Sequence, residues 1–367
     1  MREKPAEDWM GQMNQKRIKK LSTRVVLVGA GPIGIEVAAG LKRAGIDYLQ
    51  LEQGPVASTI YRWPRHARFF SSPERVAIAG FPFSSPHQEQ PTREDYLAYL
   101  RGVVETLDLS ILSYHRVMEI RGRKGSFTVR AETLRDSLVI NCEEIILATG
   151  DMGEFNRLGI PGEDLPHVSH VLEDPHLYFG NRLLIVGGKN SALEAALRCF
   201  RSGVTVSLSY RRSGFDRKRV NSRLHLELSI LTAKGLIPFY PETLPSRITE
   251  EGVELSRNDG SSEFVAADFV LLATGYHADL SLFQDLEIPL DEEGLPIYDG
   301  ETMESAVPGV YLAGTAVSGA RQRYKDFIGT SHHHTARIVR ALGGGEVPVG
   351  TIASRRYSFS TDDIEAD

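Results

Sequence analysis

The sequence predicts an α/β protein with two Rossmann-like dinucleotide-binding domains, the second inserted into the first. A short apolar run, a glycine-rich turn and a helical pattern occur in that order twice, at 24–44 and at 182–200. Each copy ends in a second apolar run closed by Ala-Thr-Gly, at Gly150 and at Gly275. Nearly continuous apolar runs are typical of parallel strands buried on both faces. The chain therefore contains two such units in series.

A further strand and helix are expected after the second unit, at 307–314 and 330–342. One strand and one helix cannot bury both of their faces alone, so we expect them to complete the first domain, which becomes discontinuous. The predicted boundaries are a flexible N-terminal extension at 1–21, the first domain at 22–155 and 284–345, the inserted domain at 156–283, and a C-terminal tail at 346–367.

Composition excludes several classes of protein. With 367 residues the chain can bury a core in each domain without disulfide or metal support. The net charge of −6, with no block of like charges, argues against a nucleic-acid partner. There is no apolar run long enough for a membrane helix, and the first twenty residues do not read as a secretory signal. Two cysteines far apart, Cys142 and Cys199, suit a reducing compartment, so we expect a cytoplasmic protein without membrane insertion.

The first glycine-rich turn, Gly-Ala-Gly-Pro-Ile-Gly at 29–34, is interpreted as a dinucleotide site rather than a structural turn. Gly29 permits the tight turn, Gly31 lets the backbone approach a pyrophosphate, and Gly34 lets the helix pack close to the strand. The N-terminus of the following helix favours phosphate. Glu52 closes the next apolar stretch, where a carboxylate can accept hydrogen bonds from ribose hydroxyls.

The second turn departs from this pattern, because Lys189 replaces the middle glycine and Ala192 the third. A lysine can reach around phosphates as a point charge. The next strand ends in Tyr210, Arg211 and Arg212 instead of an acid, and a guanidinium there can bind a 2′-phosphate. This favours NADPH over NADH; the alternative is a solvated basic loop.

Two nicotinamides in one chain would couple no chemistry, whereas a nicotinamide can reduce a flavin. We therefore assign FAD to the first, discontinuous domain and NADPH to the inserted domain.

Three consecutive histidines, His332 to His334, open the last predicted helix. Neighbouring helical residues point about 100° apart, so the three rings cannot converge on one ion, and we expect no metal site. We expect His334 to approach the flavin pyrimidine edge as an N–H donor. Cys142 and Cys199 are expected to be packing residues rather than nucleophiles.

A segment rich in aromatic and basic residues includes Trp63, Arg65 and His66. It is either a wall of the flavin pocket, with Arg65 or His66 facing the acceptor, or a loop that packs on the first domain. Glu194, one turn into the second helix, either orients the nicotinamide amide or solvates that helix.

The turn at 29–34, the paired Ala-Thr-Gly strands and the Gly-Val-Tyr-Leu-Ala-Gly strand at 309–314 resemble the thioredoxin-reductase-like flavoproteins. Within that group the stretches at 61–78, 159–170, 186–197 and 301–314 are similar to the YpdA family of NADPH-dependent bacillithiol-disulfide reductases. The resemblance covers roughly 22–345, and the Gly-Gly-Lys-Asn-Ser turn at 187–191 is its sharpest part.

The turns and the resemblance together imply cofactor contacts, with the stretch at 61–70 running past the flavin ring. The positions expected to bind FAD are Gly29, Gly31, Pro32, Ile33, Gly34, Glu52, Gln53, Trp63, Thr149, Gly150, Gly314 and Thr315. Those expected to bind NADPH are Gly187, Gly188, Lys189, Asn190, Ser191, Ala192, Arg211, Arg212, Thr274 and Gly275.

The sequence also departs from the family. The YpdA pattern has a cysteine where this chain has Ile33, Thr315 replaces an acid that often holds the ribityl chain, and the inserted domain has no Cys-x-x-Cys pair. Disulfide reduction through a mixed disulfide therefore has no obvious nucleophile.

The predicted function is that of an FAD-dependent NADPH oxidoreductase whose acceptor is a low-molecular-weight disulfide, as the resemblance implies, or a quinone or an electron-carrier protein. A flavin monooxygenase and a non-catalytic NADPH/FAD redox sensor are the alternatives, although the Phe-x-Gly-x-x-x-His motif usual in such monooxygenases is lacking. We also expect a homo-oligomer.

Overall fold

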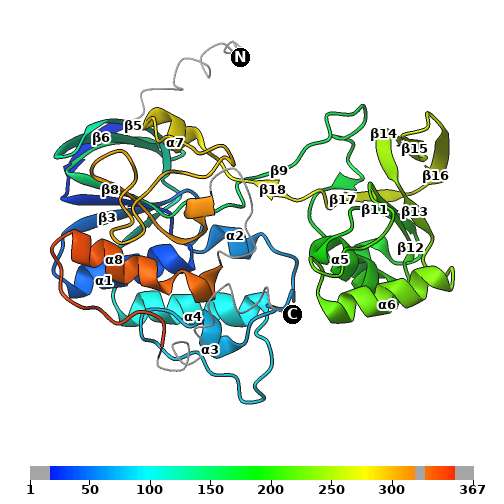
Figure 1. The fold of residues 1–367 in the computed structure, drawn as a ribbon, viewed down its shortest axis with the longest axis horizontal. Coiled ribbons are helices and arrows are strands. Elements are labelled where there is room, and N and C mark those ends of the chain that lie inside the picture. The colour runs from blue at the N-terminus through cyan, green and yellow to red at the C-terminus, as the bar shows by residue number, and fades with distance from the viewer. Residues whose placement is uncertain (1–16, 319–326, 352–367) are drawn as a thin grey trace, which may run out of the picture.

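The structure is a computed structural model that describes residues 17–318 and 327–351. Figure 1 shows two bodies side by side, a larger one coloured blue, cyan and orange and a smaller one in green. Two chain segments join them, and their strands β9 (Glu154–Phe155) and β18 (Tyr276–His277) pair antiparallel. The green body lies between two parts of the larger one in the sequence, as expected for an inserted domain.

The first domain is built on a five-stranded parallel sheet with the order β19-β8-β2-β3-β4. Every residue of β2 is buried, in agreement with the apolar run that predicted it. The last strand pairs with β8 through Val310 and Ile145, so the segment after the inserted domain completes the first sheet. The strands are β2 (Val25–Val28), β3 (Tyr48–Glu52), β4 (Ile111–Ser113), β8 (Glu144–Leu147) and β19 (Val310–Leu312).

Helices α1 and α8 pack together beside this sheet (Figure 1). Gly40 permits the close approach, because a Cβ there would lie 2.9 Å from Cγ2 of Thr335. Helix α4 begins with a capping box in which Thr92 and Asp95 exchange hydrogen bonds between side chain and backbone. The helices and turns of this domain are α1 (Pro32–Arg43), α2 (Ser58–Tyr61), α3 (Pro73–Val76), α4 (Arg93–Thr106), α7 (Ser281–Asp285), η3 (Gly314–Ser318), η4 (Ile328–Thr330) and α8 (His332–Ala341).

A second sheet of the first domain has the order β1-β7-β6-β5. Its strands are β1 (Arg17–Ser22), β5 (Arg116–Arg123), β6 (Ser126–Glu132) and β7 (Asp136–Cys142). Strand β1 corrects the prediction that the extension is flexible through residue 21, because residues 17–22 pair in parallel with β7. Backbone pairing rather than burial holds this strand, since the side chain of Ile18 is 68% exposed. Hydrophobic periodicity therefore gave no signal for it.

The first residues of the predicted C-terminal tail are also packed. The N–H of Gly350 donates to Oε1 of Glu36, and the N–H of Gly80 donates to the carbonyl of Gly350. The tail from residue 352 and the N-terminal extension through residue 16 lie outside the described residues.

The inserted domain has a five-stranded parallel sheet in the order β10-β17-β11-β12-β13. Helices α5 (Asn190–Arg201) and α6 (Ser222–Ala233) belong to one of its hydrophobic cores, and an antiparallel sheet to the other. The parallel strands are β10 (Val168–Ser169), β11 (Arg182–Val186), β12 (Thr205–Tyr210), β13 (Phe239–Pro241) and β17 (Phe269–Leu272); the antiparallel sheet has β14 (Thr243–Thr249), β15 (Gly252–Arg257) and β16 (Ser262–Ala266); a short turn, η2, covers Pro175–Tyr178. Across 17–318 and 327–351, helices of a length and apolarity suited to crossing a bilayer are absent.

Candidate active site

A cavity of about 1090 Å³, here called the central cavity, is lined by residues of both domains. Both glycine-rich turns open to it, as do both Ala-Thr-Gly segments. The structure brings nearly all predicted cofactor residues to its wall, namely Gly29, Gly31, Pro32, Ile33, Gly34, Glu52, Gln53, Trp63, Thr149, Gly150, Gly187, Gly188, Lys189, Asn190, Ser191, Ala192, Arg211, Thr274, Gly275, Gly314 and Thr315. Residues far apart in the sequence therefore share one site.

The three glycines of the first turn differ in what surrounds them. A Cβ on Gly29 would lie 2.4 Å from the carbonyl oxygen of Ala148, and one on Gly34 would lie 2.3 Å from that of Gly29. These two positions need glycine for packing within the protein. A Cβ on Gly31 would meet no atom within 4 Å, although this residue lines the cavity. The space beside Gly31 is thus available to a ligand.

Two polar features at this turn fit a bound dinucleotide. Helix α1 begins at Pro32 with Gly31 as its N-cap, and no side chain caps the helix. Its N-terminal N–H groups therefore face the cavity as an anion site. Nearby, Oγ1 of Thr149 is buried with no hydrogen-bond partner in the described structure. A buried hydroxyl without a partner is costly, and a cofactor atom at the wall would satisfy it.

Glu52 is fixed in place at the cavity wall. Its Oε2 accepts the N–H of Ala30 at 2.8 Å, and its Oε1 accepts the N–H of Gly54 at 3.0 Å and the hydroxyl of Ser58 at 2.9 Å. The residue is only 5% exposed. A carboxylate has about four acceptor sites, so this arrangement leaves capacity for a ribose hydroxyl.

The second turn is shaped by Tyr210. A Cβ on Gly188 would lie 2.4 Å from the Tyr210 ring, and a Cβ on Gly187 would lie 3.0 Å from that of Ala192. The Tyr210 ring thus packs on the turn. At the third glycine position of the motif, the small side chain of Ala192 fits beside Gly187. Lys189 is exposed and is the N-cap residue of α5.

The two neighbouring arginines that favoured NADPH are placed differently. Arg211 lines the central cavity, whereas Arg212 is absent from its wall. Nη1 of Arg212 lies 3.7 Å from Oδ2 of Asp216. We expected both arginines to reach the cofactor. Only Arg211 lies where it can do so.

The predicted catalytic histidines do not reach the cavity wall. His66 has a left-handed backbone with φ of 59°, its side chain is 75% exposed, and its backbone N–H donates to Glu94. His334 is buried, and its Nδ1 accepts the N–H of Gly314 at 3.1 Å. Burial, together with nearby His333, Arg337 and His332, lowers the pKa of His334 to about 3. Its ring is neutral and supports the backbone of Gly314 instead of donating directly into the cavity.

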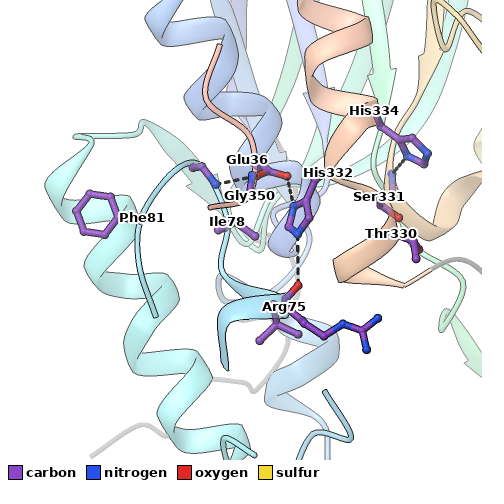
Figure 2. Close-up of polar contacts among 12 residues, drawn as sticks. Glu36, Arg75, Ile78, Phe81, Thr330, Ser331, His332, His334 and Gly350 are labelled. Atoms are coloured by element: carbon purple, nitrogen blue, oxygen red, sulfur yellow. Dashed lines mark hydrogen bonds and ion pairs between the residues drawn. The ribbon is translucent and has the colours of Figure 1, made fainter. Parts of the chain in front are cut away.

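His332 points away from His334, toward helix α1. Its Nδ1 lies 2.9 Å from Oε2 of Glu36, and its Nε2 lies 3.4 Å from the carbonyl oxygen of Arg75 (Figure 2). Burial disfavours the charged ring, but the hydrogen bond and charge of Glu36 outweigh it and raise the pKa of His332. Glu36 was missed in the sequence, although a glutamate inside the apolar stretch of α1 was a signal. Throughout the described residues, no cluster of three or more metal-ligating side chains is found.

Comparison with known proteins decides the family. The model of the pyridine nucleotide-disulphide oxidoreductase family matches residues 26–314. The chain belongs to this family. It is 31% identical to bacilliredoxin reductase Bdr of Bacillus subtilis (strain 168), over 89% of this chain and 99% of that protein. It is 23% identical to a ferredoxin–NADP reductase of Ignicoccus hospitalis, over 79% of this chain and 88% of that protein.

Solved structures agree. Bacillithiol disulfide reductase Bdr (YpdA) from Staphylococcus aureus superposes with a TM-score of 0.80 at 30% identity, over 88% of this chain and 98% of that chain. The same enzyme from Bacillus cereus gives 0.83 at 29% identity, over the same shares. As a pyridine nucleotide-disulphide oxidoreductase, this chain is an enzyme that uses FAD and NADPH. The predicted fold class, cofactors and YpdA resemblance are confirmed.

The wall of the cavity in this pyridine nucleotide-disulphide oxidoreductase carries no thiol. The chain has two cysteines, Cys142 and Cys199, and neither lines the cavity. Both are buried, and burial raises the pKa of each to about 12. Ile33 lines the cavity close to Gly314, where a Cβ would lie 3.2 Å from that of Ile33. The described wall therefore offers no cysteine nucleophile.

Helix α5 presents one stripe of polar residues to the cavity. Asn190, Glu194 and Arg198 are spaced by four residues, which places them on one face, and all three line the wall. Burial raises the pKa of Glu194. Arg198 donates from Nη2 to the carbonyl oxygen of Arg65, in the first domain, at 2.5 Å. Arg65 is absent from the wall itself, and Arg198 was missed in the sequence although its spacing from Glu194 was visible.

Proposed function

We propose that this enzyme reduces a low-molecular-weight disulfide at the expense of NADPH. The balanced reaction is NADPH + H⁺ + RSSR → NADP⁺ + 2 RSH. One observation carries the proposal, namely that the turns of both dinucleotide domains open to the same cavity. When bound there, the cofactors supply the hydride transfer between nicotinamide and flavin.

The residues of the chain bind and orient the two cofactors in this proposal. The N-terminus of α1 and the open space beside Gly31 receive the FAD pyrophosphate, and Glu52 accepts from its ribose. Lys189 and Arg211 attract the NADPH phosphates, with Arg211 on the 2′-phosphate. His334 acts through Gly314, whose N–H it accepts.

Similarity to the Bdr enzymes supports a disulfide as the acceptor, because the alignment covers 99% of the B. subtilis protein. The lack of a thiol on the wall means that the disulfide has to take its electrons from the flavin itself instead of from a protein cysteine. A small substrate suits this route, since it must enter the cavity.

An electron-carrier protein is the second candidate acceptor. The same absence of a wall cysteine favours it, because electron transfer to a carrier needs no nucleophile at the flavin. Similarity to ferredoxin–NADP reductases extends over 79% of the chain, at lower identity than that to Bdr.

Two further properties belong to this proposal. A cytoplasmic setting would supply NADPH and keep both cysteines reduced, as the free thiols suggest. The homo-oligomer expected from the sequence stays a prediction. Size-exclusion chromatography with light scattering, which gives the molar mass of the FAD-loaded protein, would test it.

The test is a two-step stopped-flow experiment on the FAD-loaded protein. Anaerobic NADPH is expected to bleach the flavin, and the reduced protein is then mixed with bacillithiol disulfide, glutathione disulfide, a quinone, a ferredoxin or oxygen. Fastest reoxidation by a small disulfide supports the proposal. Fastest reoxidation by ferredoxin or quinone, a peroxyflavin spectrum with oxygen, or no turnover with any acceptor would contradict it, and the last would indicate a redox sensor.

A further inference from the structure

Helix α5 extends from the second glycine-rich turn to a hydrogen bond with the first domain. It starts at Asn190, within the second glycine-rich turn at 187–191, and Arg198 lies eight residues further on. At about 1.5 Å per residue this separation is ~12 Å along the helix axis. The helix thus joins the nucleotide turn to a point of contact with the first domain.

The contact is made by a charged donor and a neutral acceptor on different domains. Nη2 of Arg198 donates to the carbonyl oxygen of Arg65 at 2.5 Å. The side chain of Arg198 is only 20% exposed, so solvent screens this hydrogen bond weakly.

The acceptor belongs to a loop that is itself fixed. Arg93, the first residue of α4, donates from Nη2 to the carbonyl oxygen of Tyr61 at 2.6 Å, and its backbone N–H donates to Ala67 at 2.8 Å. The N–H of Ala67 in turn donates to Pro64. These bonds hold the loop on either side of Arg65, so its carbonyl is presented to α5 by a rigid support.

Arg198 has a second, weaker partner on its own helix, a long ion pair with Glu194. Glu194 lies one turn earlier, in the orientation that favours an ion pair within a helix, yet its Oε1 is 3.9 Å from Nη1 of Arg198. Nη1 is buried with no hydrogen-bond partner in the described structure. The short hydrogen bond of the guanidinium thus goes to the other domain, and only the long ion pair stays within its own helix.

We infer that Arg198 is a positioning residue, which holds α5 and the nucleotide turn at its start against the first domain through the carbonyl of Arg65. This inference rests on the proposed function, because such positioning affects the reaction only if NADPH at that turn reduces FAD. Arg198 then sets the alignment of the two cofactors and contributes little to the binding of either one alone.

The test uses FAD-loaded enzyme with Arg198→Ala, Arg198→Lys and a control, Arg201→Ala. Arg201 lies on the same helix, but its guanidinium pairs with Glu227 inside the inserted domain and is 55% exposed. Three quantities are measured: the limiting rate of flavin reduction at saturating NADPH, the Kd for NADP⁺, and amide hydrogen exchange over residues 62–68.

Arg198→Ala is expected to lower the limiting rate by about tenfold or more, because small misalignments of reacting groups are costly. It should leave the Kd for NADP⁺ within about twofold, since this contact lies outside the phosphate site, and it should speed exchange over 62–68. Arg198→Lys, which can still donate to the carbonyl, should recover much of the rate. Arg201→Ala should match the unmodified enzyme.

The inference is overturned if Arg198→Ala reduces flavin at the original rate, loses NADP⁺ affinity in parallel with rate, or behaves like Arg201→Ala. Failure of the unmodified enzyme to be reduced by NADPH would instead overturn the proposed function. In that event, amide hydrogen exchange over residues 62–68 would still test the contact between Arg198 and Arg65. Unchanged exchange in Arg198→Ala would refute the contact as well, whereas faster exchange would support it as a link between the domains.

Discussion

Oε2 of Glu36 lies 2.9 Å from Nδ1 of His332, and both side chains are buried. Oε1 of the same carboxylate accepts the N–H groups of Ala79, at 2.7 Å, and of Gly350, at 2.6 Å (Figure 2). One carboxylate thus joins α1, α8, the loop after α3 and the C-terminal segment. The pair stabilises the half of the first domain that contains the FAD turn.

Glu36→Ala is expected to lower the free energy of unfolding by roughly 3–5 kcal/mol, because it leaves the buried His332 ring and two backbone donors without their acceptor. Urea unfolding of the cofactor-free protein measures the change. Glu301→Ala is the matched control, since that glutamate is exposed and 3.8 Å from its arginine partner. A loss no larger than that of the control would refute the role of the pair.

The same pair predicts a pH dependence of stability. The pKa of His332 is raised above its ordinary value of 6.5, so its stabilising contribution is fully present below that value and is lost as pH rises through the higher folded-state pKa. Unfolding free energies measured from about pH 6 to pH 9 should fall more steeply for the unmodified protein than for His332→Gln. Parallel curves for the two proteins would show that His332 does not titrate with folding.

The first turn predicts two different outcomes for two alanine substitutions. Gly31→Ala should leave the stability of the cofactor-free protein unchanged, because the added Cβ meets no protein atom and the residue has φ of −71°, but it should reduce bound FAD. Gly34→Ala should destabilise the protein itself, since its Cβ would lie 2.3 Å from a carbonyl oxygen. Flavin content and thermal unfolding separate the two effects. Full FAD occupancy in Gly31→Ala would argue against a cofactor beside that residue.

Arg211→Ala should raise KM for NADPH by about tenfold to a hundredfold, because a charge-assisted hydrogen bond to the 2′-phosphate is lost. The KM for NADH, which has no 2′-phosphate, should change little. Arg212→Ala should have a small effect, because that guanidinium lies near Asp216 and not on the cavity wall. Steady-state kinetics with both nucleotides provides the comparison. Equal effects of the two substitutions, or an equal rise in KM for NADH, would refute the assignment.

Replacing both cysteines by alanine should leave disulfide reduction within about twofold of the original rate, since neither thiol lines the cavity and deleting one sulfur affects mainly packing. Thermal unfolding of the double variant controls for loss of structure. A folded variant that still oxidises NADPH but no longer reduces any disulfide would assign a buried thiol to the chemistry.

The cofactor turns could be predicted from the sequence because the glycine spacing at 29, 31 and 34, between an apolar run and a helical pattern, is visible in the chain itself. The Glu36–His332 pair could not, since its members are 296 residues apart and a buried pair leaves no periodic pattern. Strand β1 was missed because the side chains at 18–22 are exposed and the backbone of the strand does the pairing. His66 was misplaced because a left-handed backbone turns its side chain outward, and composition carries no sign of that.

Anaerobic mixing of the FAD-loaded protein with NADPH tests the central claim most directly. If the two turns bring nicotinamide and flavin together in one cavity, the flavin absorbance near 450 nm should bleach in a single fast phase, and NADH at equal concentration should act more slowly. The account would be contradicted if the protein took up no flavin, or if the bound flavin stayed oxidised after NADPH was added.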